Sequence, residues 1–267
     1  MGFSDVPPPH VSPWFGPVYD ATFHFAGAAW TLCYILIARE GLRTKSYGMP
    51  LFALANNFAW EMVWALYVAD SPLEKTAMTI WMVIDIPIIY STLRYGAYEW
   101  AHAPAVKRNL GKIFVFLVVM CGAAHFGFAS WWIRNGIAEK PGKFYRGVEG
   151  PDITEMSFWA VSTCQVVVSV TSLAQLITRQ HSGGTSWAIW ASRFFGTLVG
   201  LNINYGWAWY TWTEAHEYFV SSPGIFMWSI TTICDILYAI ILLNVKRSEK
   251  VLADGRKVAG DQSKKGL

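Results

Sequence analysis

The sequence contains few charged residues: they make up 15% of its 267 residues, whereas a soluble domain carries about a quarter. Hydrophobic residues make up 54%, and they gather in runs of about 20 residues, the length that crosses the hydrocarbon core of a bilayer. The runs lie at 18–38, 49–69, 76–95, 111–133, 155–177, 186–210 and 220–245. This pattern predicts an all-α membrane protein built as a bundle of seven transmembrane helices.

Several motifs that define other classes of protein are absent. The chain has no adjacent pair of aspartates, so it lacks an aspartate-rich site for magnesium and diphosphate, and it has no glycine-rich phosphate loop. Of the six histidines, only His24 and His125 fall in apolar runs, without metal-ligand spacing. No lysine between 220 and 245 could form a retinal Schiff base. We therefore predict no metal and no cofactor, and the short motifs of heptahelical receptors are missing too.

The N-terminus also lacks basic residues. Met1 to Asp20 contains no Lys or Arg, so no basic region of a cleavable signal peptide is visible. Four segments, all on one side of an alternating seven-helix topology, hold 15 of the 21 Lys and Arg; they are 39–48, 94–112, 178–185 and 246–267. Basic residues favour the cytoplasmic side. This predicts a lumenal or external N-terminus and a cytoplasmic C-terminus.

The same reading gives a domain organisation. It predicts an N-terminal segment at 1–17, a transmembrane domain at 18–245 and a basic tail at 246–267, whose charge and glycine content favour disorder. We expect a multi-pass integral membrane protein located in the endoplasmic reticulum. The loop at 134–154 is the longest connection, and either caps a pocket or is a plain loop.

Three acids are placed where charge is costly. Glu61, Asp85 and Asp235 lie near the middles of the second, third and seventh runs. An acid at this depth costs ~2.5–3.5 kcal/mol even on the more lenient scale, and burial favours its neutral form. A single such acid often only bonds a neighbouring helix, but three at one depth favour a functional site that donates protons. Arg193 either pairs with an acid or extends its long side chain to the membrane interface; the second is favoured, because the residue lies near a helix end.

The surroundings of these acids are polar and aromatic. Asn57 lies one helical turn before Glu61, and Tyr238 lies almost one turn after Asp235. Aromatic faces stabilise cations by ~0.5–2 kcal/mol each, although most tryptophans in a membrane protein are interface or packing residues. The candidate substrate-binding residues are Asn57, Trp60, Trp64, Trp81, Asn204 and Tyr238.

A resemblance follows from several short stretches. They are Tyr47-Gly48-Met49-Pro50 leading to Asn57-Phe58-Ala59-Trp60-Glu61, Glu99-Trp100-Ala101-His102-Ala103-Pro104 with Arg108-Asn109-Leu110, Ser192-Arg193-Phe194-Phe195-Gly196, and Asp235 with Tyr238. Together they resemble the fungal integral membrane terpene cyclases of meroterpenoid and paspaline-type indole diterpenoid pathways. The resemblance runs from about Tyr19 to Lys246.

The resemblance implies an activity. Such cyclases act on a prenyl chain attached to an aromatic or indole unit, after an upstream prenyltransferase has attached the chain and a flavin monooxygenase has epoxidised its terminal alkene. An acid protonates the epoxide and a cationic cascade closes the rings. The two key acids of the family fall on Glu61 and Asp235, one as the proton donor and the other orienting it or the epoxide. Asp85 is a weaker match that could assist or take the final proton.

Two other classes of protein stay open on the residues alone. A proton-coupled transporter or channel would use intramembrane acids as a relay, but no internal repeat is visible in the sequence. A heptahelical receptor is disfavoured by the motifs that the chain lacks. The substrate's aromatic half and the length of its prenyl chain do not follow from the sequence.

Overall fold

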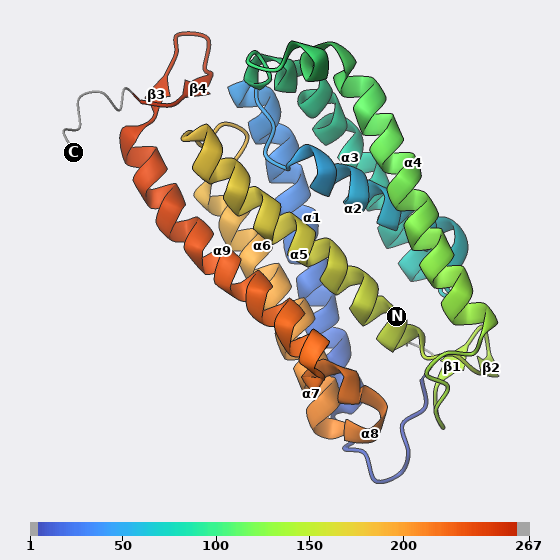
Figure 1. Cartoon of the computed structure of the whole chain (residues 1–267). Helices are drawn as coiled ribbons and strands as arrows, with labels where there is room; N and C mark the ends of the chain where they lie inside the picture. Colours follow the sequence, from blue (N-terminus) through green and yellow to red (C-terminus); the bar gives the residue numbers. More distant parts are fainter. Residues whose placement is uncertain (1–4, 261–267) are drawn as a thin grey trace.

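The computed structural model describes residues 5–260, and helices make up most of this part of the chain (Figure 1). Five helices are long and apolar enough to cross a membrane: α1 (Phe15–Thr44), α3 (Pro72–Glu99), α4 (Pro104–Arg134), α5 (Ile153–Arg179) and α9 (Ser222–Ser248). They overlap five of the runs predicted from the sequence. The protein is therefore a helical integral membrane protein.

The other two apolar runs form interrupted helices. α2 (Leu51–Val63) continues into a π-helical turn at Trp64–Val68. α6 (Trp187–Thr197) passes through a second π-helical turn at Leu198–Ile203 into α7 (Asn204–Thr211). Turns of this kind are frequent at functional sites. The sequence alone would predict one long regular α-helix for each of these runs, and neither run forms one.

The remaining elements are short. α8 (Thr213–His216) and a 3₁₀ turn at Glu217–Val220 lead into α9. One hairpin pairs β1 (Phe144–Tyr145) with β2 (Val148–Glu149), and another pairs β3 (Lys250–Val251) with β4 (Lys257–Val258). Both hairpins lie in the connections and ends of the chain, and Tyr145 of β1 packs with the helices in a buried hydrophobic cluster.

Local sequence explains where several helices begin. α3, α5, α6 and α9 each start after a Ser or Asp whose side chain accepts a hydrogen bond from a backbone N–H of the first turn; these caps are Ser71, Asp152, Ser186 and Ser221. Such caps satisfy N–H groups that have no partner within the helix. α3, α4 and α9 also carry a proline in the first turn, where its missing N–H costs least.

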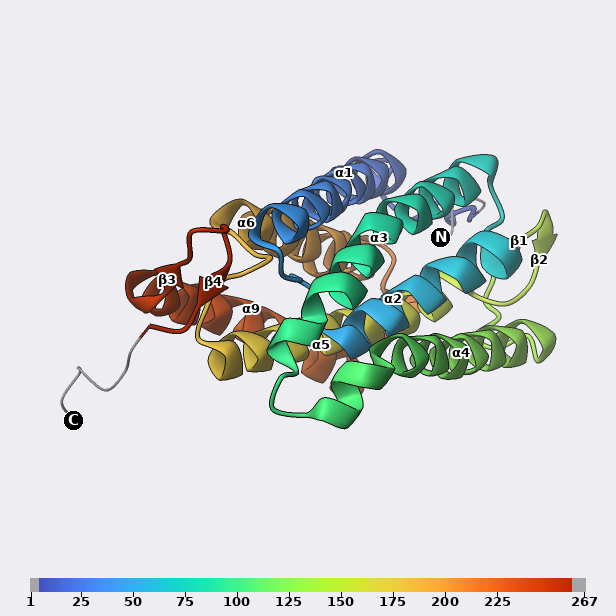
Figure 2. The ribbon, with the colours of Figure 1, turned by 90° about the horizontal axis from the view of Figure 1, so that it is seen from above.

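The long helices pack largely in pairs, and the short helix α2 lies among α3, α4 and α5 (Figure 2). α1 lies along α6, α2 along α4, and α5 along α9, and α2 is surrounded by longer helices (Figures 1 and 2). Gly196 and Gly200 face α1 so closely that an added Cβ would lie 2.9 Å from Trp30 and 2.5 Å from Ala26. Small residues allow such close helix contacts in membranes, where hydrophobic exclusion from water does not drive packing.

Buried charges hold one end of the bundle together. Lys143, in the 134–154 loop, is fully buried; its Nζ lies 2.8 Å from Asp5 Oδ2 and 3.3 Å from Asp152 Oδ2, and over the ring of Trp212. Burial and the adjacent lysine hold the pKa of His216 well below its usual range, so this imidazole is neutral. The loop is thus fixed to the bundle as a structural connection, and none of its residues lines the cavity described below.

The opposite end carries a second set of ion pairs. Arg179 pairs with Glu99, and Lys257 lies 3.3 Å from Glu249. Glu249 also accepts hydrogen bonds from the backbone N–H and the hydroxyl of Ser182. Residues 249–260 therefore form an ordered hairpin, although disorder was expected there from the composition. The last part of that tail, 261–267, lies outside the described residues.

The tight contact of α1 with the second π-helical turn predicts a stability effect. Gly200→Ala forces a methyl group to 2.5 Å from the Ala26 Cβ, and overpacking of this kind costs about 1–3 kcal/mol. We expect a lower midpoint of thermal unfolding in detergent. Gly127→Ala in α4 is the matched control, because its added Cβ meets nothing within 4 Å and helix propensity favours Ala by about 0.5–1 kcal/mol. Equal midpoints for the two variants would contradict the packing.

Candidate active site

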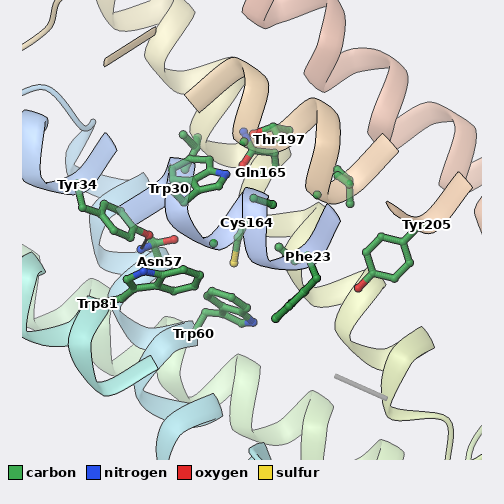
Figure 3. A pocket seen from close by; sticks show the side chains of 17 residues that line it. Phe23, Trp30, Tyr34, Asn57, Trp60, Trp81, Cys164, Gln165, Thr197 and Tyr205 are labelled. Carbon is green, nitrogen blue, oxygen red and sulfur yellow. Dashed lines mark hydrogen bonds between the residues drawn. The ribbon is translucent and has the colours of Figure 1, made fainter. Parts of the chain in front are cut away.

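An apolar cavity of about 110 Å³ lies between α1, α2, α5 and α6 with its π-helical turn (Figure 3). Three tryptophans, Trp30, Trp60 and Trp81, form part of its wall, together with Phe23 and Tyr205. Most of the lining surface is carbon. Of the six substrate-binding residues predicted from the sequence, three line the cavity; they are Asn57, Trp60 and Trp81.

Glu61 lies directly behind the cavity wall. It is fully buried, and its Oε1 accepts hydrogen bonds from the Tyr34 hydroxyl and from Asn57 Nδ2, both at 2.8 Å. Asn57 also donates to the Tyr34 oxygen at 2.7 Å. Tyr34 and Asn57 both line the cavity and lie together on one side of it (Figure 3). The acid is thus connected to the cavity by two hydrogen-bonding side chains.

Asp85 adds a second carboxyl group to this cluster. It is fully buried on α3 and lies close enough to Glu61 for the two groups to interact. Within residues 5–260, neither Asp85 oxygen nor Glu61 Oε2 has a partner in hydrogen-bond geometry. Two adjoining carboxyl groups in an apolar interior repel each other when both are ionised. This repulsion favours a form of the pair that keeps a proton, which is the form that an acid catalyst requires.

Asp235 has a different environment. Its Oδ1 lies 2.8 Å from Arg193 Nη2, and both side chains are buried. The guanidinium also lies over the ring of Tyr238, 4.7 Å from its centre. The expectation that Arg193 reaches the interface is wrong, because only 5% of the residue is exposed. A buried carboxylate one helix away gives the guanidinium a closer partner than lipid headgroups would.

The structure places the three acids in two groups. Glu61 and Asp85 interact across α2 and α3, whereas Asp235 pairs with Arg193 between α9 and α6. Among the interactions of the described residues, no hydrogen bond or ion pair links Asp235 to Glu61 or Asp85. Asp235 does not line the cavity.

Three predicted substrate-binding residues lie outside the cavity wall. Trp64 is fully buried behind Trp60 and packs against it with ring centres 5.5 Å apart. Asn204 ties α7 to α1 by donating to the backbone oxygen of Tyr19 at 2.7 Å. Tyr238 donates its hydroxyl to Thr185 at 3.1 Å. The helical pattern places these side chains in the interior, but their partners depend on how the helices are rotated against each other.

The comparison with known families identifies the chain. A family model described as Pyr4-like transmembrane terpene cyclases matches residues 4–248. The chain belongs to this family. It is 62% identical to terpene cyclase ascF of Acremonium egyptiacum over 261 residues, which cover 98% of this chain and 94% of the relative. The chain is therefore a membrane-bound terpene cyclase.

More distant relatives carry the same description. The Pyr4-family terpene cyclase mfmH of Annulohypoxylon moriforme is 32% identical over 87% of this chain and 88% of its own length. Terpene cyclase paxB of Penicillium paxilli is 30% identical over 88% of this chain and 89% of its own length. No solved structure shows a significant match to this chain.

Several residues of the cyclase cavity were not predicted from the sequence. Tyr34, Trp30, Gln165 and Thr197 line it. An amide such as Gln165 in an apolar run is a usable signal, because such groups are rare in spans. Tyr34 gives no such signal, since tyrosine is common near membrane interfaces.

Among residues 5–260, no group of three or more His, Cys, Asp or Glu is arranged to hold a metal ion.

The Arg193–Asp235 ion pair predicts that removing both charges destabilises the protein less than removing the carboxylate alone. Asp235→Asn leaves the Arg193 charge buried without its carboxylate, and removing one member of a buried pair costs about 3–5 kcal/mol. We expect this variant to unfold at a clearly lower temperature. Asp235→Asn combined with Arg193→Met removes both charges and should recover most of the loss, as measured by thermal unfolding in detergent. A double variant as unstable as the single one would contradict the pairing.

Proposed function

We propose that this cyclase protonates an epoxidised prenyl chain attached to an aromatic or indole unit, and that Glu61 is the proton donor. The observation that carries the proposal is the cluster of Glu61, Asp85, Tyr34 and Asn57, buried at the wall of an aromatic cavity. In this assignment Asp85 shares the proton with Glu61. The substrate belongs to meroterpenoid biosynthesis.

The environment of the acids supports this assignment. Asp235 is already paired with the guanidinium of Arg193, a cation that keeps its charge in proteins, so we do not assign it the role of proton donor. Among residues 5–260, no ion pair involves the adjoining carboxyl groups of Glu61 and Asp85. Asp235 then orients the site through its charge, and the epoxide receives its proton from the Glu61 side.

The proposed cyclisation needs no reagent other than the substrate and the side chains of the site. The Glu61 proton passes to the epoxide oxygen, directly or through the Tyr34 hydroxyl, while the carbon–oxygen bond breaks. The neighbouring alkene attacks the developing cation, further rings close, and the last cation loses a proton to the carboxylate left on the Glu61–Asp85 pair, which restores the acid. General acid catalysis of this kind contributes about 10²–10⁴-fold. The faces of Trp30, Trp60 and Trp81 in the cavity wall stabilise the cations.

The arrangement in the membrane belongs to the same proposal. The five long helices, together with the helical segments 51–68 and 187–211, make seven crossings. The basic segments support a lumenal N-terminus and a cytoplasmic C-terminus, and we assign the protein to the membrane of the endoplasmic reticulum. The transmembrane cyclase domain spans 18–245, between an N-terminal segment at 1–17 and the tail at 246–267.

The substrate chemistry determines the neighbours in the pathway. A lipophilic chain on an aromatic unit must be attached by a prenyltransferase, and its terminal epoxide must be supplied by an oxygenase such as a flavin monooxygenase. Such a substrate partitions into lipid and can enter the cavity laterally from the bilayer. The apolar lining of the cavity disfavours water, which would otherwise trap the cation before the rings close.

Substitution of the donor tests the proposal. Glu61→Gln removes the acidic proton and keeps the size of the side chain, so we expect cyclisation to fall at least 100-fold. Tyr34→Phe removes one hydrogen bond to Glu61 and should cost about tenfold. The assay is incubation of microsomes with epoxidised farnesyl and geranylgeranyl aromatics, followed by product analysis at equal protein level.

Glu214→Gln is the matched control, since this glutamate is exposed, bonds His10 and does not line the cavity. It should cyclise at the rate of the unmodified protein. A Glu61→Gln variant that keeps the full rate would refute Glu61 as the donor. No product from any substrate in the panel with the unmodified protein would refute the proposed substrate class.

A further inference from the structure

A second cavity, larger than that of the candidate active site, lies at the end of the bundle that carries the Arg179–Glu99 ion pair. Its volume is about 610 Å³, and it is bordered by the start of α2, the turn between α3 and α4, and the end of α5. We name it the outer cavity, and that of the candidate active site the inner cavity. Ala174 and Thr178 line the outer cavity and are exposed. The outer cavity is therefore open to the surroundings of the protein.

Two of the stretches that carry the family resemblance meet at the outer cavity. Residues 47–50 lead into α2, and residues 99–104 lead from α3 into α4. Five of these residues line the outer cavity: Tyr47, Pro50, Glu99, Trp100 and His102. The proposed reaction uses none of them, so their place in the fold points to a different task.

The two cavities follow one face of α5. Cys164 and Val168 line the inner cavity, and Thr171 and Gln175 line the outer one. Residues three or four positions apart are neighbours on one face of a helix, so these four side chains form one continuous stripe. The stripe is about 17 Å long, because each helical residue adds about 1.5 Å. The cavities thus lie end to end along α5.

The α2 segment shows the same alignment. Pro50, just before α2, lines the outer cavity, and Asn57 lines the inner one. Leu54 lies one turn from each, is fully buried, and belongs to the same hydrophobic cluster as Val168. α2 and α5 lie side by side (Figures 1 and 2). Leu54 and Val168 therefore form a layer of apolar side chains between the two cavities.

The charges of the outer cavity are already compensated. Arg179 pairs with Glu99 and donates a hydrogen bond to the backbone oxygen of Tyr47 at 2.9 Å. Burial and the nearby Arg179 charge lower the pKa of His181 to about 4, so this imidazole is neutral. Among the described lining residues, Arg179 is the one Lys or Arg. A phosphate group would meet no unpaired guanidinium or ammonium here, which disfavours an anionic lipid headgroup.

Aromatic and apolar surfaces make up much of the remaining wall. Trp100 and His102 stack with their ring centres 5.7 Å apart, and Leu51 and Ala174 add aliphatic carbon. Aromatic rings attract other rings in stacked or edge-to-face arrangements. These surfaces suit a neutral molecule that combines an aromatic unit with an apolar chain.

From this alignment we propose that the outer cavity is an entrance site for the prenylated aromatic substrate, which passes from it along the α5 stripe and past Leu54 to the inner cavity. The assignment rests on the proposed function and names the route by which the substrate reaches the same acids. Rotamer changes of side chains are faster than collective motions of helices. Leu54 and Val168 can therefore admit the substrate without a rearrangement of the bundle.

The experiment blocks the outer cavity reversibly. Thr178→Cys places a thiol in its wall, and Ile177→Cys is the matched control, because Ile177 is also exposed on α5 but does not line the outer cavity. A methanethiosulfonate reagent that carries a sulfonate group attaches to either thiol as a disulfide, and a reducing agent removes it. The four native cysteines are buried, and an apolar interior excludes the charged reagent.

The readout is the rate of binding, which does not require turnover. The probe is a farnesylated benzene whose terminal alkene replaces the epoxide, and its association and dissociation are followed by stopped-flow quenching of tryptophan fluorescence. Three tryptophans line the inner cavity. We expect labelled Thr178→Cys to show both rates lowered about tenfold with an unchanged Kd, because a blocked path slows passage equally in both directions. Reduction should restore both rates.

The outcomes separate the entrance from the reaction. Unchanged rates in labelled Thr178→Cys, or rates that fall equally in labelled Ile177→Cys, would overturn the entrance. A weaker Kd with an unchanged association rate would mean that the label distorts the protein instead of blocking a path, and would overturn it too. Rates that fall as expected, with no product from the matching epoxide in the unmodified protein, would support the entrance and overturn the proposed reaction.

Discussion

An apolar membrane interior penalises an ionised carboxyl group unless a cation or a set of donors compensates it, and this constraint determines the arrangement of the core. The chain meets it in two ways. Glu61 and Asp85 lie together with Tyr34 and Asn57 and no cation, which favours retention of a proton. Asp235 is compensated by Arg193. The first arrangement suits proton donation, and the second fixes a charge without supplying a proton.

The fold follows from apolar runs to a large extent. Run length alone locates the five long helices, because lipid requires every backbone polar group to be bonded within a helix. The π-helical turns at Trp64–Val68 and Leu198–Ile203 were not predictable, since they depend on contacts with neighbouring helices, such as that of Gly200 with Ala26. The ordered hairpin after α9 depends on Glu249 meeting Ser182, 67 residues away in the chain.

The sequence predicts how deep the site residues lie in the membrane, but not toward which neighbour each face of a helix is turned. Hydropathy shows that Glu61 and Asp85 lie within apolar runs, and the structure brings these two together. Which face of one helix meets which face of another is not contained in a single run, so Trp64, Asn204 and Tyr238 were assigned to a cavity that they do not line. For the same reason, Arg193 was expected at the interface instead of beside Asp235.

The protonation state of Glu61 in the resting protein is the central claim, and infrared spectroscopy measures it directly. The carbonyl stretch of an un-ionised carboxylic acid is separate from that of a carboxylate, and ¹³C labelling of glutamate displaces it. At neutral pH we expect a glutamate-derived acid band that Glu61→Gln removes and Asp235→Asn leaves in place. A band that persists in Glu61→Gln, or that is lost only in Asp235→Asn, would contradict the account.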